Sequence, residues 1–178
     1  MASTQQVHHQ TILNEVMKEL DSHVSKQNVK VNQEQALTNG AIGNHAKCNL
    51  ELKSINEYSG HFSTPGPAQI LEDGNITKFE HEGTPPQGSK VGVAYHAKGH
   101  QWVMAWMVPL QNPATKPALN KVYIEDGPDA EIDWKDIEMK LESSREYSFC
   151  PGGLASITQG SVAKLAAAFI DPENPPNN

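Results

Sequence analysis

Apolar residues recur with a helical spacing in the first part of the chain. Between residues 8 and 26 they fall on one face of a helix, with charged and amide side chains opposite; the apolar positions are Ile12, Leu13, Val16, Met17, Leu20 and Val24. A period of about 3.6 residues predicts an amphipathic helix. We expect this helix to pack on the rest of the protein; the alternative is that it leaves the domain to meet a membrane or a partner. Residues 27–46 are polar and rich in Asn and Gln, so we expect a loop or linker there.

From Cys48 onward the period changes to two, which is typical of half-buried strands. The predicted strands, separated by Gly, Pro and Asp-Gly turns, are 48–53, 76–81, 90–97, 101–108 and 121–125, with a short apolar piece at 68–71. The two most apolar strands, 90–97 and 101–108, carry apolar side chains on both faces, as expected at the centre of a sandwich. A three-residue connection, Lys98-Gly99-His100, is predicted to join them.

Two further segments complete the predicted elements. Trp134, Ile137 and Leu141 form a stripe that predicts a helix over 131–142. Residues 161–170 favour a closing strand, although their alanines would also suit a helix. The predicted fold is therefore all-β, a β-sandwich with an N-terminal amphipathic helix and one further short helix. We divide the chain into a helix and linker (1–40), a sandwich domain (41–171) and a disordered tail (172–178).

Composition and charge narrow the classes of partner. The 178 residues carry a formal net charge of −7, and the basic residues are scattered, so we expect no nucleic-acid partner. The N-terminus has no secretory signal, and no apolar run approaches the ~18 residues of a membrane span. Cys48 and Cys150 are expected to be unpaired thiols. We expect a cytoplasmic protein without a transmembrane segment; the sequence leaves its oligomeric state open.

Motifs that carry chemistry are scarce. The chain has no Gly-rich phosphate loop, no G-x-S-x-G elbow and no C-x-x-C pair. His81, His96 and His100 could approach one another, but their spacing is not helical, and we expect no carboxylate beside them to orient metal ligands. We therefore predict no catalytic residues, no metal and no cofactor. The alternative is an enzyme that pairs His61, His81 or His96 with a loop carboxylate.

Short motifs in the middle of the chain give a resemblance to a known family. The stretch VGVAYHAKGHQWVMAWMVP (91–109), a loop and then NKVYIED (120–126) resemble the central hairpin and following strand of actinoporins and aegerolysin-like cytolysins. Within that set the chain looks closest to the plant jasmonate-induced protein family, which also has a helical N-terminal extension. The matching motifs are Gly60-His61, Phe79-Glu80-His81, the strand 88–93, Ala105-Trp106 and Asn120-Lys121-Val122-Tyr123.

The resemblance implies a β-sandwich in a stress- or defence-induced plant protein without a known reaction. Actinoporins bind phosphocholine headgroups, and the positions that match their pocket, or that stand in the shared motifs, give our candidate ligand-binding set: Ser59, His61, Val91, Pro109, Tyr123 and Trp134. The chain departs from actinoporins in the loop 110–120, which has no aromatic residue to anchor in a bilayer. Lysis is therefore not expected. We expect a binding protein that recognises a sugar or a lipid headgroup at one end of the sandwich; the alternative is a cytolysin-like protein that inserts its N-terminal helix into lipid.

Overall fold

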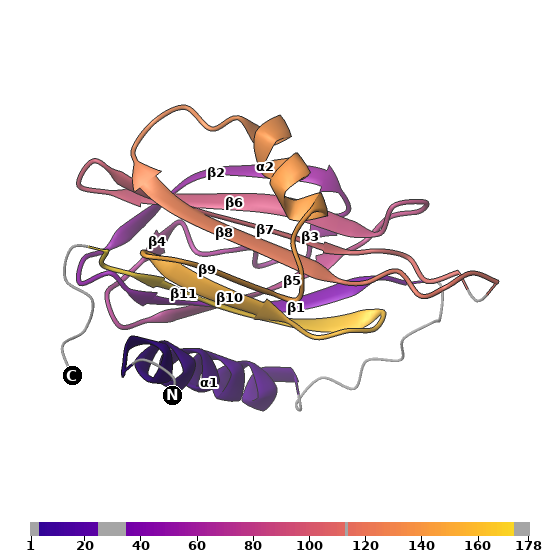
Figure 1. Cartoon of the computed structure of the whole chain (residues 1–178), viewed down its shortest axis with the longest axis horizontal. Coiled ribbons are helices and arrows are strands. Elements are labelled where there is room, and N and C mark those ends of the chain that lie inside the picture. Colours follow the sequence, from indigo (N-terminus) through magenta and orange to yellow (C-terminus); the bar gives the residue numbers. More distant parts are fainter. Residues whose placement is uncertain (1–3, 25–34, 113, 173–178) are drawn as a thin grey trace.

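Two β-sheets lie face to face, and one helix covers the outer face of each (Figure 1). The computed structural model describes residues 4–24, 35–112 and 114–172. Helix α1 (Thr4–Val24) lies on the six-stranded sheet, and helix α2 (Trp134–Glu142) lies on the five-stranded sheet. The predicted β-sandwich with two helices is confirmed.

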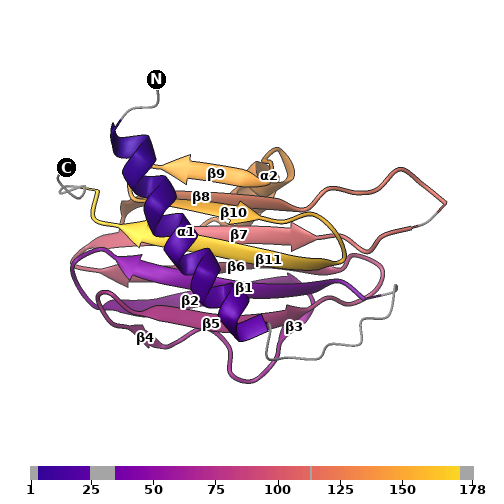
Figure 2. The same ribbon diagram turned by 90° about the horizontal axis from the view of Figure 1, so that it is seen from below.

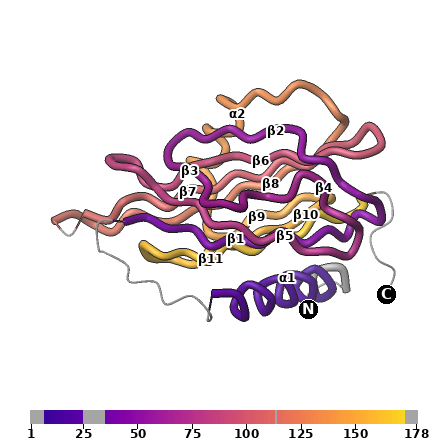
Figure 3. Tube along the Cα trace, turned by 180° about the vertical axis from the view of Figure 1, so that it is seen from behind, coloured from indigo at the N-terminus to yellow at the C-terminus, as the bar shows by residue number. Residues whose placement is uncertain are grey.

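The strand order shows how the chain is wound between the layers. The six-stranded sheet has the order β3-β5-β1-β11-β10-β9, with β3 (His61–Phe62), β5 (Ile76–Glu82), β1 (Leu37–His45), β11 (Val162–Ile170), β10 (Gly153–Ile157) and β9 (Tyr147–Cys150). The five-stranded sheet has the order β4-β2-β6-β7-β8, with β4 (Ile70–Leu71), β2 (Leu50–Ser59), β6 (Ser89–Ala97), β7 (His100–Val108) and β8 (Lys121–Pro128). Figure 3 shows the same layers from behind.

Strand β1 occupies a place for which we expected a loop. The prediction of a loop over 27–46 is wrong for 37–45, while residues 27–34 lie outside the described part of the chain. Two buried polar residues of β1 are hydrogen-bonded: Thr38 Oγ1 lies 2.9 Å from Ser89 Oγ, and the Asn44 side chain donates to two backbone carbonyls at 2.8 Å. Gly40 leaves room for the Phe79 ring, which a Cβ atom would meet at 2.1 Å. Because the segment is polar, its hydropathy predicted an exposed linker where the protein has an interior strand.

The remaining differences are small and local. Ala97 pairs with His100, so Lys98 and Gly99 form a two-residue turn instead of the predicted three-residue one. Their φ angles of 51° and 77° are those of a type I′ turn. Strands β9 and β10, which are joined by a turn after Cys150, were not predicted. The last segment is a strand, β11, as favoured from the sequence. Helix α2 is capped by Asp133, whose carboxylate accepts from the amides of Lys135 and Asp136.

Helix α1 packs on the six-stranded sheet through the apolar face that was predicted from the sequence. Its largest buried side chains are Ile12, Leu13, Val16 and Leu20, each at most 4% exposed. They pack on alanines and aliphatic side chains of β1, β10 and β11. Two ion pairs flank this contact, Lys78–Glu19 at 3.1 Å and Lys164–Asp21 at 2.6 Å. Among the described helices, none is long and apolar enough to cross a membrane.

The interior between the sheets holds a cluster of aromatic side chains around Trp106. Trp106 is fully buried and stacks on Phe79, with ring centroids 5.3 Å apart. The rings of Phe62 and His81 meet it edge-on. His81 is fully buried, and its Nδ1 atom lies 2.8 Å from Ser89 Oγ. Burial lowers the pKa of His81 to about 4, so its ring is neutral in the folded protein at neutral pH.

Truncation of the central aromatic residue tests the assignment of the core. Trp106→Ala should lower the free energy of unfolding by about 3–5 kcal/mol, because it leaves a cavity against Phe79 that the sheet cannot close. Denaturant unfolding measures the change. A loss below about 1 kcal/mol would contradict the central position of this strand.

The buried His81 predicts a dependence of stability on pH. Because the folded-state pKa of about 4 lies below the ordinary value of 6.5, the neutral form is favoured by folding. The contribution is complete above pH 6.5 and is lost as the pH falls towards 4, by roughly 3 kcal/mol at about 1.4 kcal/mol per pKa unit. Urea unfolding at a series of pH values should show this fall, and His81→Gln should flatten it. The control His23→Gln, at an exposed position on α1, should leave the fall unchanged.

Candidate functional site

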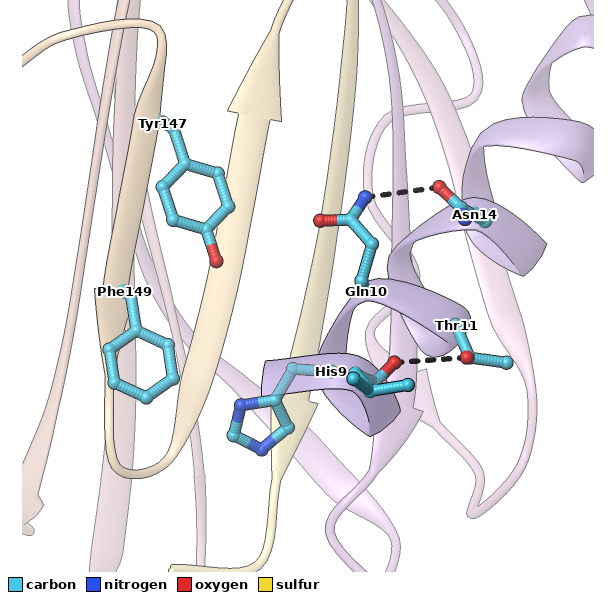
Figure 4. Close-up of a pocket in the computed structure, with 7 residues that line it drawn as sticks. His9, Gln10, Thr11, Asn14, Tyr147 and Phe149 are labelled. Carbon is cyan, nitrogen blue, oxygen red and sulfur yellow. Dashed lines mark hydrogen bonds between the residues drawn. The ribbon is translucent and has the colours of Figure 1, made fainter. Parts of the chain in front are cut away.

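A groove lies between the N-terminal half of α1 and the edge strand β9 (Figure 4). Its volume is about 740 Å³. The described residues that line it are Val7, His9, Gln10, Thr11, Asn14, Tyr147 and Phe149. Three of them expose large apolar surfaces: Val7 is 57% exposed, Tyr147 46% and Phe149 52%.

The alternation of strand β9 places its two aromatic residues in this groove. Side chains two residues apart lie on the same face of a strand, so Tyr147 and Phe149 face outward together. The intervening Ser148 turns towards the other sheet, where its hydroxyl accepts from the Ile124 amide at 3.1 Å. Helix α1 crosses the six-stranded sheet obliquely, and its N-terminal end lies close to β9 (Figure 2). The groove is thus the space between an edge strand and a helix that crosses it at an angle.

The polar side chains of the groove are uncharged. Gln10 donates to Asn14 at 3.1 Å, and Thr11 donates to the Val7 carbonyl at 3.0 Å, so both bonds stay within the helix (Figure 4). Burial, with a smaller effect of His8, lowers the pKa of His9, and burial raises the pKa of Tyr147. Both side chains are therefore neutral at neutral pH. No acidic, lysine or arginine side chain stands among the described lining residues. The groove is suited to a ligand that is mostly apolar and carries no net charge.

A second cavity of about 420 Å³ lies at the end of the sandwich where β1 and β11 finish and β7 begins. Its described lining residues are Ala46, Lys47, Cys48, Ala97, Lys98, His100, Trp102, Asp171 and Pro172. Lys47 and Lys98 have φ angles of 58° and 51° and are the non-glycine residues with positive φ in the described chain. A residue with a Cβ atom pays about 1–2 kcal/mol in this conformation. The cavity has charges of both signs, with Asp171 beside the two lysines, so it favours neither an anion nor a cation.

The histidines of this end have the carboxylate partners that we did not expect. His96 Nδ1 lies 2.7 Å from Asp129 Oδ2, and His100 Nε2 lies 3.1 Å from Asp126 Oδ2. The expectation that no carboxylate stands beside them is wrong, because β8 continues to residue 128 and brings both aspartates to the hairpin. His81 lies apart from them, on the other sheet. Within the described residues, no group of three His, Cys, Asp or Glu side chains is arranged to hold a metal ion.

Two of the residues predicted from the resemblance meet at the loop before β6. Ser59 Oγ donates to the Gly88 carbonyl at 2.8 Å. The backbone of Pro109 lies against the same glycine, where a Cβ atom would come within 3.1 Å of its carbonyl carbon. His61 is on the neighbouring strand β3, exposed, with Nε2 3.9 Å from Glu82 Oε2.

The other three predicted residues lie elsewhere. Val91 is fully buried in the core between the sheets. Tyr123 on β8 and Trp134, the first residue of α2, belong to the cluster on the outer face of the five-stranded sheet. The Tyr123 hydroxyl donates to Glu125 at 2.7 Å, and the Trp134 ring covers Gly92. The structure therefore does not gather the six predicted residues around one cavity, and neither the groove nor the second cavity is lined by any of them.

The residues of the groove were not found from the sequence. Residues 143–149 follow a helix and precede a turn, and we assigned no element to them. The alternation of Tyr147 and Phe149 with Ser148 and Cys150 is the signal of a strand with one apolar outer face. A strand of only four residues is too short for that signal to stand out.

The two free thiols are both partly buried. Cys48 lines the second cavity, and Cys150 is packed against the core. Both are unpaired in the structure. Burial raises the pKa of each, so neither thiol is activated as a nucleophile at neutral pH.

Comparison with known proteins gives a match at the level of the fold. No protein-family model and no curated protein sequence matches the chain. Among solved structures, the crystal structure of the lipid binding protein Nakanori is similar, with a TM-score of 0.68 and 15% sequence identity. The match covers 88% of this chain and 79% of that chain. The resemblance to jasmonate-induced proteins and actinoporins thus rests on the sequence motifs. What this chain shares with the lipid binding protein Nakanori is its β-sandwich fold.

Proposed function

We propose that this protein binds a lipid or a similar small molecule with an apolar body in the groove between α1 and β9, and that it acts by binding alone. The observation that carries the proposal is the convergence of Val7, Tyr147 and Phe149, all about half exposed, on one groove of about 740 Å³. Exposed apolar surface that is gathered in a concave site marks ligand binding more often than chance. The lipid-binding function of a protein with the same fold supports the same class of ligand.

Of the two ligand classes expected from the sequence, sugar and lipid, the groove favours lipid. Covering the exposed parts of the three apolar side chains would contribute roughly 2–4 kcal/mol before the ligand's own apolar surface is counted. A sugar would need several polar groups aimed at its hydroxyls, whereas Gln10 and Thr11 form their hydrogen bonds within the helix. A role in plant stress or defence is part of this proposal and rests on the sequence resemblance.

The buried histidine supports binding over catalysis. His81 and Ser89 are hydrogen-bonded at 2.8 Å, as a general base and a nucleophile would be. Both side chains are fully buried in the core, however, and no substrate can reach them. His61 and His96, the other histidines considered for an enzyme, lie near carboxylates and not beside a nucleophile.

The alternative function, insertion of α1 into a membrane, would need the helix to leave its sheet. Exposing Ile12, Leu13, Val16 and Leu20 to water would cost on the order of 6 kcal/mol or more. The two ion pairs to Lys78 and Lys164 would also be lost. The loop 110–120 offers no aromatic residue to offset this cost at the bilayer interface.

Detergent monomers test the groove directly. Dodecylphosphocholine and dodecyl maltoside, both below their critical micelle concentrations, should both bind, because they share the tail that the groove contacts. Phe149→Ala should weaken both about five- to tenfold, which corresponds to about 1–1.4 kcal/mol. The matched control Leu119→Ala removes an exposed apolar side chain elsewhere and should change nothing. Isothermal titration calorimetry measures the affinity of each detergent for the wild type and for both variants. Equal binding by the wild type and Phe149→Ala would contradict the proposal, and binding of the phosphocholine alone would favour a headgroup site.

Vesicle leakage tests the alternative. We expect no dye release from phosphatidylcholine–sphingomyelin vesicles at micromolar protein, because the cost of undocking α1 is not repaid by anchoring residues. Clear dye release at these concentrations would show instead that α1 leaves the sheet in the presence of lipid.

A further inference from the structure

The histidine of the groove has no hydrogen-bond partner. His9 is 3% exposed, and both of its ring nitrogens are buried without a partner. Its ring lies 5.3 Å from the Phe149 ring and turns towards it from the first turns of α1 (Figure 4). Buried polar atoms in folded proteins almost always have a partner, so an unpaired pair of nitrogens needs an explanation.

His9 is the buried polar side chain of the groove, and its ring nitrogens have no hydrogen-bond partner. Two other polar side chains of the groove, Gln10 and Thr11, already donate hydrogen bonds within α1. His9 lines the groove together with Phe149, which is 52% exposed and has space to rotate away from the imidazole. A ligand that displaces the Phe149 ring would therefore meet a ring nitrogen.

The charge of the site decides which polar group can enter. A neutral imidazole has one N–H donor and one acceptor nitrogen. In its neutral form His9 offers no counter-charge to a ligand, the other described lining residues are uncharged, and the protein as a whole carries −7. A carboxylate or an ammonium group would be desolvated there without a counter-charge. A hydroxyl or an uncharged carboxylic acid can both donate and accept, and it leaves no charge unpaired.

We propose, on the basis of the lipid-binding function above, that the groove takes a single-chain amphiphile with an uncharged hydroxyl or carboxylic acid end, and that His9 binds this end. The tail lies along Val7, Tyr147 and Phe149, and the polar end enters the groove towards α1. His9 is thus the residue that distinguishes an oxygen-bearing amphiphile from a plain hydrocarbon. The apolar side chains alone would not make this distinction.

Two ligands of equal length test the inference. 1-Octanol and 1-chlorooctane share the tail, but only the alcohol has a hydroxyl. Competition against a bound uncharged fluorescent dye, N-phenyl-1-naphthylamine, measures both affinities. The wild-type protein should prefer 1-octanol about three- to tenfold, the effect of one buried neutral hydrogen bond. His9→Phe should keep the affinity for 1-chlorooctane and lose the preference, whereas His9→Gln, whose amide can donate and accept, should keep part of it.

A spectroscopic measurement ties the preference to the ring itself. Saturation with 1-octanol should shift a ring-nitrogen resonance of His9 in ¹⁵N NMR, and 1-chlorooctane should shift it much less. The control His23→Phe, on an exposed position of α1, should behave as the wild type in both experiments. If both ligands bind equally and His9→Phe has no effect, the inference is overturned and the proposed apolar groove stands. If neither ligand binds, the inference and the proposed function both fail.

Discussion

The burial of the apolar stripe of α1 against the six-stranded sheet is the contact on which the rest of the outer architecture depends. Ile12, Val16 and Leu20 lie on a surface of small residues, chiefly Ala41, Ala166 and Ala168, that lets the helix approach the strands closely. Gly43 permits the closest approach, because a Cβ atom there would meet Val16 at 2.8 Å. The helix axis is fixed by this surface, and the oblique crossing leaves its N-terminal turns beside β9. The groove is a consequence of that angle, since the helix forms one of its two walls.

Elements whose buried apolar side chains recur at a regular spacing were predictable from the sequence, and elements that bury polar side chains were not. α1, α2, β6 and β7 each bury a regular set of apolar side chains, so their periods are visible in the sequence. β1 is buried on both sides but contains Thr38 and Asn44, whose side chains are hydrogen-bonded to distant residues, Ser89 and Leu71. No local pattern can reveal those partners. A strand whose polar side chains are hydrogen-bonded to distant residues is therefore predicted as a linker when only its own sequence is considered.

The candidate site was less predictable than the fold for a related reason. The six residues chosen by resemblance occupy positions defined by short motifs, and the structure uses Val91 for the core and Trp134 for packing α2 over Gly92. Ser59 and Pro109 do converge, on Gly88, as the order of the motifs implies. The groove instead combines residues about 140 positions apart, from α1 and β9. Its existence depends on a helix–sheet crossing angle that neither segment encodes alone.

The parallel pairing of β1 with β11 has a consequence for how the protein is made. Leu37 pairs with Val162 and His45 with Ile170, so a strand near the start of the chain completes its hydrogen bonds only with the last strand. During synthesis on a ribosome, β11 leaves the exit tunnel long after β1. Until then β1 lacks one neighbour, and the alanines of β11 that receive α1 are missing. Closure of the six-stranded sheet must therefore wait until β11 is available, and sequence separation of this size slows folding. Until β11 is in place, the apolar face of α1 lacks most of the surface that covers it in the folded protein.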